Sequence, residues 1–170
     1  MNITAGKYKG RKVIAPDEKI TRPTLSKVRM AVFNTLQSLI DFENASFLDM
    51  FAGSGIMGLE AISRGFGKVV AIEQNPKIIK ILNENYKSLS IKPNIIRGDS
   101  LKVIPKEYFD IIYIDPPYYS GIYEKSLEVL PNCHIVILEH TTNVDFKNFS
   151  IIKQKKYGDK FLTFLKKCNI

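Results

Sequence analysis

The chain lacks several features that would assign it to a specialised class of protein. Its 170 residues include two cysteines, Cys133 and Cys168, whose number and spacing indicate neither a disulfide scaffold nor a metal site. The histidines, His134 and His140, also have no partner at a metal-ligand spacing. No apolar run is long enough to cross a bilayer, and the first residues lack the apolar core of a signal peptide. We therefore expect no metal site and a location in the reducing cytoplasm.

The composition is typical of one globular domain, but its charge is unevenly distributed. The chain is 45% hydrophobic and 25% charged, with a formal net charge of +8. Residues 1–40 carry eight basic and two acidic side chains, and residues 147–170 carry seven basic and one acidic. Residues 41–146 carry ten basic and fourteen acidic side chains. Basic ends of this kind are an electrostatic footprint for nucleic acid, although a solvated lysine-rich surface gives the same pattern.

Apolar runs separated by amphipathic segments predict an α/β sheet. The runs are apolar throughout, which is typical of parallel strands covered on both faces. Strands are predicted at residues 47–51, 68–73, 94–99, 109–115 and 133–139, and helices at 56–64, 76–89, 101–104 and 123–130. Residues 149–155 and 161–167 predict an antiparallel terminal hairpin that turns near Gly158. We expect a seven-stranded sheet with this antiparallel tail.

The first forty residues predict a small basic extension made of a hairpin and a helix. Residues 3–5 and 12–15 flank a tip with two glycines, and Thr24 is expected to cap the helix that follows. Arg29 lies within that helix and is expected to be a surface cation that could hold a phosphate together with Arg22. Cations interleaved with an aromatic ring can neutralise phosphates and stack on bases. The candidates are Lys7, Tyr8, Lys9, Arg11, Lys12, Arg22 and Arg29.

The stretch Asp115-Pro116-Pro117-Tyr118 carries the strongest chemical signal. It follows a buried apolar strand, at the edge of an open α/β sheet where ligands bind. The prolines stop the strand and donate no N–H groups, so nearby carbonyls are less engaged in a ladder. An acceptor pair beside a flat ring suits a planar base held by its exocyclic amine. The same residues also form ordinary rigid turns, so the stretch alone leaves both interpretations open.

A glycine-rich loop predicts a nucleotide-like ligand beside this stretch. Residues 51–58 contain a Gly-x-Gly-x-x-Gly pattern between a predicted strand and a predicted helix. Glu73 ends the next strand, about twenty residues on, and is placed to accept hydrogen bonds from ribose hydroxyls. The loop residues expected to line the site are Phe51, Gly53, Ser54 and Gly55.

Two further acids favour S-adenosylmethionine over a dinucleotide. A dinucleotide would place its pyrophosphate on the helix N-terminus and would need neither Asp49 nor Asp99. Asp49 precedes the loop and could take the ammonium of the methionine part, directly or through water. Asp99, with Ser100 beside it, is placed to receive the adenine amine, although Asp99 is also a candidate helix cap. Three acids at the ends of three consecutive strands suit a cationic sulfonium ligand better than an anionic diphosphate.

These elements together resemble a known family. The segments FLDMFAGSGIMGLEA, AIE, GD and DPPY resemble the Rossmann-like amino-methyltransferases that use S-adenosylmethionine. The segments GKYKGRK, RPT and KVRMAVFN, with the late KYG and FL, narrow the resemblance to the RsmD-type 16S ribosomal RNA guanine-N2 methyltransferases. The resemblance covers nearly the whole chain, and the N-terminal signature joined to DPPY is its most specific part.

The resemblance implies methylation of the exocyclic amine of one guanine in small-subunit ribosomal RNA. On this sequence it implies that Asp49, Gly53, Gly55 and Glu73 bind the cofactor, that Asp99 contacts the adenine, and that Asp115 and Tyr118 take the target base. Pro116 would add its carbonyl. We interpret residues 1–170 as one Rossmann-like domain, with residues 1–40 as the RNA-binding extension and 41–170 as the catalytic core. The expected partner is ribosomal RNA, free or in an assembling small subunit, and nothing demands more than a monomer.

Three alternatives stay open at this level. A DNA adenine-N6 or cytosine-N4 amino-methyltransferase also uses DPPY, but such enzymes usually add a target-recognition region for which 170 residues leave little room. A non-catalytic RNA-binding protein of the same fold is disfavoured by the intact DPPY stretch. A dehydrogenase would bind NAD in place of S-adenosylmethionine. Glu139 ends the fifth strand on the ligand edge, and we expect a structural role for it.

Overall fold

The computed structural model describes residues 1–17, 24–117 and 121–168, and the following elements lie within them. The helices are α1 (Ser26–Gln37), α2 (Ile56–Ser63), α3 (Pro76–Ser88), α4 (Ser100–Val103) and α5 (Ile122–Glu128). The strands are β1 (Ser46–Asp49), β2 (Lys68–Glu73), β3 (Ile95–Arg97), β4 (Phe109–Ile114), β5 (Cys133–His140), β6 (Phe149–Tyr157) and β7 (Lys160–Lys167).

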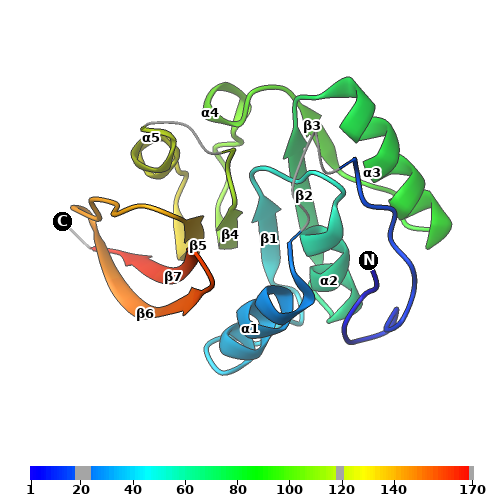
Figure 1. Ribbon diagram of the computed structural model, residues 1–170, viewed down its shortest axis with the longest axis horizontal. Helices are drawn as coiled ribbons and strands as arrows, with labels where there is room; N and C mark the ends of the chain where they lie inside the picture. The colour runs from blue at the N-terminus through cyan, green and yellow to red at the C-terminus, as the bar shows by residue number, and fades with distance from the viewer. Residues whose placement is uncertain (18–23, 118–120, 169–170) are drawn as a thin grey trace.

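The seven strands form one sheet in the order β3-β2-β1-β4-β5-β7-β6, drawn in Figure 1. The four pairings from β3 to β5 are parallel, and β7 pairs antiparallel with both β5 and β6. The sequence prediction of a mostly parallel sheet with an antiparallel terminal hairpin is therefore confirmed. Strands β2 and β3 extend the sheet on one side of β1, and β4 and β5 extend it on the other side. The carboxyl ends of β1 and β4 therefore form a topological switch point, where open α/β sheets bind ligands.

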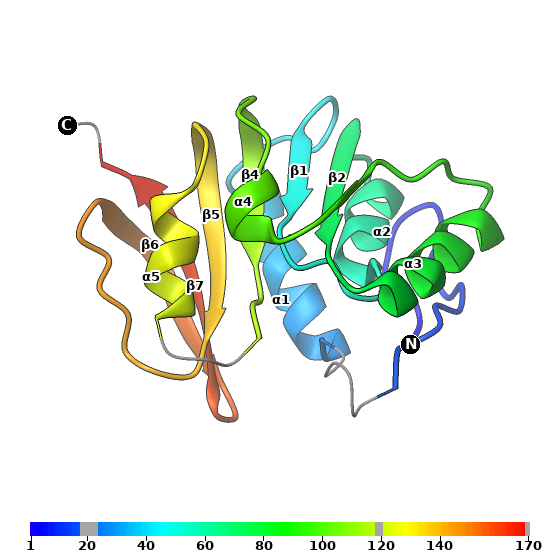
Figure 2. The ribbon, with the colours of Figure 1, turned by 90° about the horizontal axis from the view of Figure 1, so that it is seen from above.

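Two hydrophobic cores cover the two faces of the sheet. One face packs Phe47, Tyr113 and Phe164 against side chains of α1, α2 and α3. The opposite face packs Leu48 and Ile112 together with residues of α5 and the segment around α4. Figure 1 shows α4 and α5 above the strands and α1 and α2 below them, and Figure 2 shows α4 and α5 in front of the strands. Strands buried on both faces explain why the sequence shows continuous apolar runs in place of alternation.

The N-terminal segment forms the predicted hairpin. Residues 1–3 pair antiparallel with residues 10–13, because the Ile3 N–H donates to the Arg11 carbonyl at 3.0 Å and the Val13 N–H to the Met1 carbonyl at 2.7 Å, on either side of the bridge between Asn2 and Lys12. The tip of the hairpin bonds to helix α2, since the Lys7 and Tyr8 N–H groups donate to the Ser63 carbonyl and hydroxyl at 2.7 and 2.9 Å. In Figure 1 this dark blue segment runs beside α2 and α3. The predicted hairpin is thus confirmed, with its pairing at residues 1–3 and 10–13, and its contacts to α2 and α3 hold it against the domain.

Two expectations about α1 are wrong. The helix begins after Leu25 and has no capping side chain, whereas Thr24 contributes only its carbonyl oxygen, which accepts a hydrogen bond from Arg29. Arg29 is not a surface cation, because it is 2% exposed and donates to Glu60 at 3.2 Å and to the Asn2 carbonyl at 2.8 Å. A guanidinium with these buried partners cannot also reach a phosphate on the surface.

Glu60 is the centre of this buried polar network. Its carboxylate is fully buried in α2, pairs with Arg29 and Arg64, and accepts hydrogen bonds from the backbone N–H and hydroxyl of Thr4. One side chain therefore ties the N-terminal segment, α1 and α2 together. Removing an acid that has several buried donors strongly destabilises the fold, because its partners are left buried without a counter-charge or acceptor.

We expect Glu60→Ala to lower the free energy of unfolding by about 3–5 kcal/mol, because Arg29 is left buried without its counter-charge. Urea unfolding followed by circular dichroism measures the change. The matched control is Glu107→Ala, which removes an acid paired with Lys68 on the surface, and it should cost less than about 1 kcal/mol. Equal losses in the two variants would show that the Glu60 network does not hold the fold together.

Candidate active site

The register of the sheet places a row of charged side chains on one face at the carboxyl ends of the strands. Residues two apart in a strand share a face. The side chains facing the core under α1, α2 and α3 include Ala71, Phe47, Tyr113, Ile137 and Leu162, one from each of five strands. Two positions further toward the carboxyl edge stand Glu73, Asp49, Asp115, Glu139 and Lys160. Four acids and one ammonium therefore line this edge side by side.

Asp49 lies between Glu73 and Asp115 in this row and is the acid without a hydrogen-bond partner among the described residues. Its side chain is 1% exposed, and neither carboxylate oxygen has a hydrogen-bond partner among the residues that the structure describes. Burial raises the pKa of Asp49 to about 8, with smaller contributions from the charges of Asp115, Glu73 and Glu139. The backbone N–H of Phe51 opposes this rise without making a well-oriented hydrogen bond. A buried carboxylate in this state fits a cationic ligand group.

Glu73 ends β2 and supports the glycine-rich loop directly. One of its carboxylate oxygens accepts the Gly53 N–H at 3.0 Å, and the other accepts the N–H groups of Gln74 and Asn75, both at 2.9 Å. Gly53 has a φ of 54°, a conformation that favours glycine. The side chain is half-buried, so the carboxylate is held in place while its remaining acceptor capacity faces the ligand edge.

The other glycines of the motif serve close packing. Gly55 has a φ of 80°, and a Cβ there would lie 2.9 Å from the Tyr86 ring. A Cβ on Gly58 would lie 2.5 Å from the Tyr86 hydroxyl, so both glycines let α3 approach the start of α2. Ser54 is buried and its carbonyl accepts a hydrogen bond from Asn85 of α3 at 2.9 Å. The loop is thus fixed from behind by α3, and Phe51 packs partly buried on the other core.

Asp99 and Ser100 occupy the turn after β3. Asp99 caps α4 by accepting the Leu101 N–H at 3.0 Å, as the alternative interpretation of the sequence proposed. Its other oxygen lies 3.7 Å from the Lys102 ammonium. Ser100 is buried and donates its hydroxyl to the Met50 carbonyl, which ties this turn to the end of β1. An adenine contact for Asp99 stays a prediction, compatible with the cap because a carboxylate accepts several hydrogen bonds.

Asp115 follows β4 and is held by a cation from the terminal hairpin. Lys160 at the start of β7 donates to Asp115 Oδ1 at 3.2 Å and to Glu139 Oε2 at 2.8 Å. The buried Tyr113 hydroxyl donates to Glu139 Oε1. Pro116 is buried beside Asp115, and Tyr118 lies outside the described residues. Sequence reasoning assigned Glu139 a structural role. It missed Tyr113, which the register between β4 and β5 places here, and Lys160, which the antiparallel register between β5 and β7 brings to the same place.

The basic candidates of the N-terminal segment lie away from this row. Lys7, Lys9, Arg11 and Lys12 are exposed, and the Lys7 ammonium lies 5.3 Å from the centre of the half-buried Tyr8 ring. The tip of the segment, with Lys7 and Tyr8, is bound at Ser63, where α2 ends, whereas the glycine-rich loop lies where α2 begins. Eight helical residues separate the two ends by about 12 Å. Arg22 lies outside the described residues, and Arg29 is the buried residue described above.

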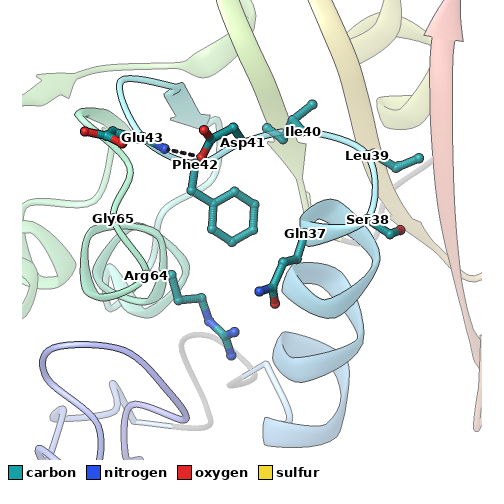
Figure 3. Close-up of a pocket in the computed structure, with 9 residues that line it drawn as sticks. All are labelled: Gln37, Ser38, Leu39, Ile40, Asp41, Phe42, Glu43, Arg64 and Gly65. Atoms are coloured by element: carbon teal, nitrogen blue, oxygen red, sulfur yellow. Dashed lines mark hydrogen bonds between the residues drawn. The ribbon is translucent and has the colours of Figure 1, made fainter.

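A separate hollow of about 720 Å³ opens at the opposite edge of the sheet. It lies between the ends of α1 and α2, and Figure 3 shows the Phe42 ring at its centre, with the Glu43 N–H donating to Asp41 at 3.1 Å. Its cation, Arg64, is already bonded to Glu60 and Thr4. Because these residues precede β1, the hollow faces away from Asp49 and Asp115. We place the chemistry at the row of acids, where the buried Asp49 has no hydrogen-bond partner among the described residues.

Metal clusters and membrane-spanning helices are both absent from the described ranges. No group of three or more His, Cys, Asp or Glu side chains there is arranged to hold a metal ion. None of the helices in the described part of the chain combines the length and apolar character needed to span a bilayer.

Comparison with known proteins identifies relatives over nearly the full chain. A family model described as Conserved hypothetical protein 95 matches residues 1–166. A ribosomal RNA small subunit methyltransferase D from Buchnera aphidicola is 38% identical over 134 residues, which cover 76% of this chain and 69% of that protein. The protein of the same name from Haemophilus influenzae is 29% identical over 174 residues, covering 93% of this chain and 89% of its own.

Solved structures share the fold at lower identity. A structure from Escherichia coli assigned as a methyltransferase superposes with a TM-score of 0.86 at 24% identity, covering 99% of this chain and 98% of that one. An RNA methyltransferase from Salinibacter ruber in complex with S-adenosyl-L-homocysteine gives a TM-score of 0.67 at 16% identity, covering 88% and 95%. These similarities extend through the terminal hairpin and confirm the predicted Rossmann-like fold class.

The raised pKa of Asp49 predicts a stability that changes with pH. Between about pH 4 and pH 8 the unfolded chain releases the Asp49 proton while the folded chain retains it, so its contribution to folding becomes less favourable as pH rises. Asp49→Asn removes this effect. The variant should gain unfolding free energy over wild type as pH rises, reaching several kcal/mol at pH 8, since each unit of pKa shift corresponds to about 1.4 kcal/mol.

Urea unfolding of both proteins at a series of pH values tests this expectation. Asp145→Asn is the control, because Asp145 is exposed and pairs with Lys147 at the surface. Its difference from wild type should stay within about 0.5 kcal/mol at every pH. A difference for Asp49→Asn that is also flat with pH would mean that Asp49 is not a destabilised carboxylate.

Proposed function

Because this chain belongs to the Conserved hypothetical protein 95 family, together with the ribosomal RNA small subunit methyltransferase D proteins, we propose that it methylates small-subunit ribosomal RNA with S-adenosylmethionine as donor. The proposed acceptor is the exocyclic N2 amine of one guanine. Ribosomal RNA, free or within an assembling small subunit, is the proposed partner, and a cytoplasmic monomer is the proposed working form.

The observation that carries the proposal is the uncompensated Asp49 carboxylate between Glu73 and Asp115. S-adenosylmethionine brings a sulfonium and an ammonium, both of which a buried carboxylate attracts. NAD brings a diphosphate, which the same row of acids repels. The donor set therefore fits S-adenosylmethionine and disfavours a dehydrogenase. Support for the cofactor also comes from a relative of the same fold, the Salinibacter ruber enzyme with S-adenosyl-L-homocysteine.

Each proposed cofactor residue has a role consistent with its position. Asp49 would face the cationic methionine part, Glu73 would accept the ribose hydroxyls, and Asp99 with Ser100 would lie beside the adenine. The glycine-rich loop would contact the ligand mainly through its backbone. Its residues at the site are Phe51, Gly53, Ser54 and Gly55. When bound, the cofactor supplies a methyl group on a positively charged sulfur, which makes that carbon susceptible to attack by an amine.

Asp115 and Pro116 would orient the acceptor. An aromatic amine is a poor nucleophile because its lone pair is delocalised into the ring, so orientation matters more than a strong base. Asp115 would accept one N–H of the amine and the Pro116 carbonyl the other, which directs the lone pair toward the methyl group. Positive charge that develops on nitrogen during transfer is then stabilised by the carboxylate. Tyr118 would stack on the base, and holding the two reactants in line supplies much of the rate.

We expect Asp115→Ala to lower the rate of methyl transfer by about 100-fold or more, because it removes the acceptor of the amine N–H and its charge. The assay incubates small-subunit ribosomal RNA from cells lacking this gene with radiolabelled S-adenosylmethionine, and mass mapping identifies the methylated nucleotide. Titration calorimetry should show affinity for S-adenosylhomocysteine within about threefold of wild type, and no binding of NAD.

The control for Asp115→Ala is Asp145→Ala, which removes an exposed acid far along the chain. Undiminished methylation by a folded Asp115→Ala protein would refute the role of Asp115. Methylation of duplex DNA in place of RNA would favour an adenine-N6 or cytosine-N4 amino-methyltransferase. Binding of RNA without methyl transfer by wild type would favour a non-catalytic RNA-binding protein.

The exposed cations of the N-terminal segment are proposed to bind RNA phosphates. If they do, the affinity for RNA should fall steeply with salt, and Lys9→Ala should reduce the slope of log K against log salt by about one. Fluorescence anisotropy with labelled RNA between low and moderate salt measures both. Lys80→Ala, which removes an exposed cation of α3, should leave the slope unchanged. A flat response of wild type to salt would contradict phosphate binding by this segment.

A further inference from the structure

Lys160 connects two acids of the candidate site to the terminal hairpin. Its ammonium lies 3.2 Å from Asp115 Oδ1 and 2.8 Å from Glu139 Oε2. The side chains of Lys160 and Asp115 are each 16% exposed, and that of Glu139 is 2% exposed. These contacts are therefore largely removed from solvent, where charge-assisted hydrogen bonds are stronger and less screened than at a surface.

The Lys160 ammonium is held in place by Glu139, which is itself fixed by a second hydrogen bond. Glu139 accepts from both Lys160 and the buried hydroxyl of Tyr113, so its carboxylate is anchored on the β4 side as well as on the β7 side. Burial raises the pKa of Tyr113 well above its usual value, with Glu139 as the next contribution, so the phenol remains a donor. The ladder between β5 and β7 pairs Glu139 with Leu162, two residues beyond Lys160. The pairing of β4 with β5 and of β5 with β7 therefore fixes the position of Lys160 relative to Asp115.

The position of this cation divides the row of acids into two halves. Asp49 and Glu73 face the glycine-rich loop, and neither is paired with a cation within the described ranges. Asp115 and Glu139 share Lys160 on the side of the terminal hairpin. A lysine beside Asp49 would occupy the place of the cofactor's positive charge. A lysine beside Asp115 leaves that place open and lowers the repulsion that Asp115 receives from its acidic neighbours.

We propose that Lys160 is a positioning residue for methyl transfer, which keeps the Asp115 carboxylate ionised and fixed in rotation for the acceptor amine. The inference rests on the proposed function. The groups that face Asp115 in the described part of the chain include Asp49 from β1, Tyr113 from β4, Glu139 from β5 and Lys160 from β7. Without the ammonium, the carboxylates of Asp115 and Glu139 lie beside each other and beside the buried Asp49, and acids that share a site tend to retain a proton.

The test compares Lys160→Met with wild type in the methyl-transfer assay across pH. We expect kcat to fall about tenfold or more, because Asp115 loses its orientation. The acidic limb of the kcat profile should move to higher pH by about one unit or more, because a proton now binds to the carboxylates at neutral pH. KM for RNA and Kd for S-adenosylhomocysteine should stay within about threefold, since neither ligand is held by Lys160.

Two further variants separate positioning from a purely structural ion pair. Lys160→Arg keeps the charge and should restore most of kcat and the wild-type pH profile. Lys80→Met removes an exposed cation of α3 and should change neither. If Lys160→Met unfolds, Lys160→Gln keeps a hydrogen-bond donor without charge and should show the same pH shift. A loss of thermal stability with kcat and pH profile unchanged would overturn the proposal.

A measurement independent of turnover separates this inference from the proposed function. Carbon-13 NMR of side-chain carboxyl groups follows the titration of Asp115 directly in the unliganded protein. We expect the Asp115 signal to titrate at higher pH in Lys160→Met than in wild type, and an unchanged titration would refute the role of Lys160. Absence of methyl transfer by wild type, with the titration shifted as expected, would refute the proposed function and not the contact.

Discussion

The buried carboxylate of Asp49 is the constraint on which the candidate site depends. It ends the central strand of a parallel sheet, where hydrophobic side chains of both cores exclude water. Burial with no hydrogen-bond partner among the described residues raises the pKa of Asp49 to about 8, so the folded chain carries an acid that resists ionisation near neutral pH. A group in this state lowers stability, and under the proposed function the positive charge of the bound cofactor compensates it.

The rest of the structure holds that ligand site in a fixed shape before anything binds. Tyr86 of α3 fills the space that Cβ atoms would occupy at Gly55 and Gly58, and Asn85 holds the carbonyl of Ser54. Glu73 holds the Gly53 N–H from the other side. The residues that a sequence motif marks for ligand binding are therefore also the residues that pack helices together. A preformed loop of this kind spares the ordering entropy that a flexible loop would lose on binding.

Local and nearest-neighbour features of the chain were predictable from its sequence. Apolar runs indicated the parallel strands, and the acids at their ends indicated the ligand edge, because parallel strands align their carboxyl ends regardless of exact register. The errors lie in long-range pairing. Arg29 was expected at the surface because its helix neighbours do not reveal Glu60, thirty-one residues away. Lys160 was missed because its contact with Asp115 depends on the antiparallel register between β5 and β7.

The distribution of charge along the chain gives a physical reason why the candidate site would accept an RNA base and exclude the RNA phosphates. Both ends of the chain are basic, and the middle is acidic. Under the proposed function, the basic ends attract the RNA backbone, whereas the acids of the row other than the protonated Asp49 repel phosphates from the place where transfer occurs. A guanine is neutral and presents N–H donors, so it is not subject to that repulsion and gains acceptors at the same place. The ammonium of Lys160 is compatible with this selection because it is already bonded to two carboxylates and adds no net positive charge to the row. Repulsion of the RNA backbone and attraction of the amine therefore act together. Under the proposed function, the carboxyl edge of the sheet accepts a base that has left its helix or loop.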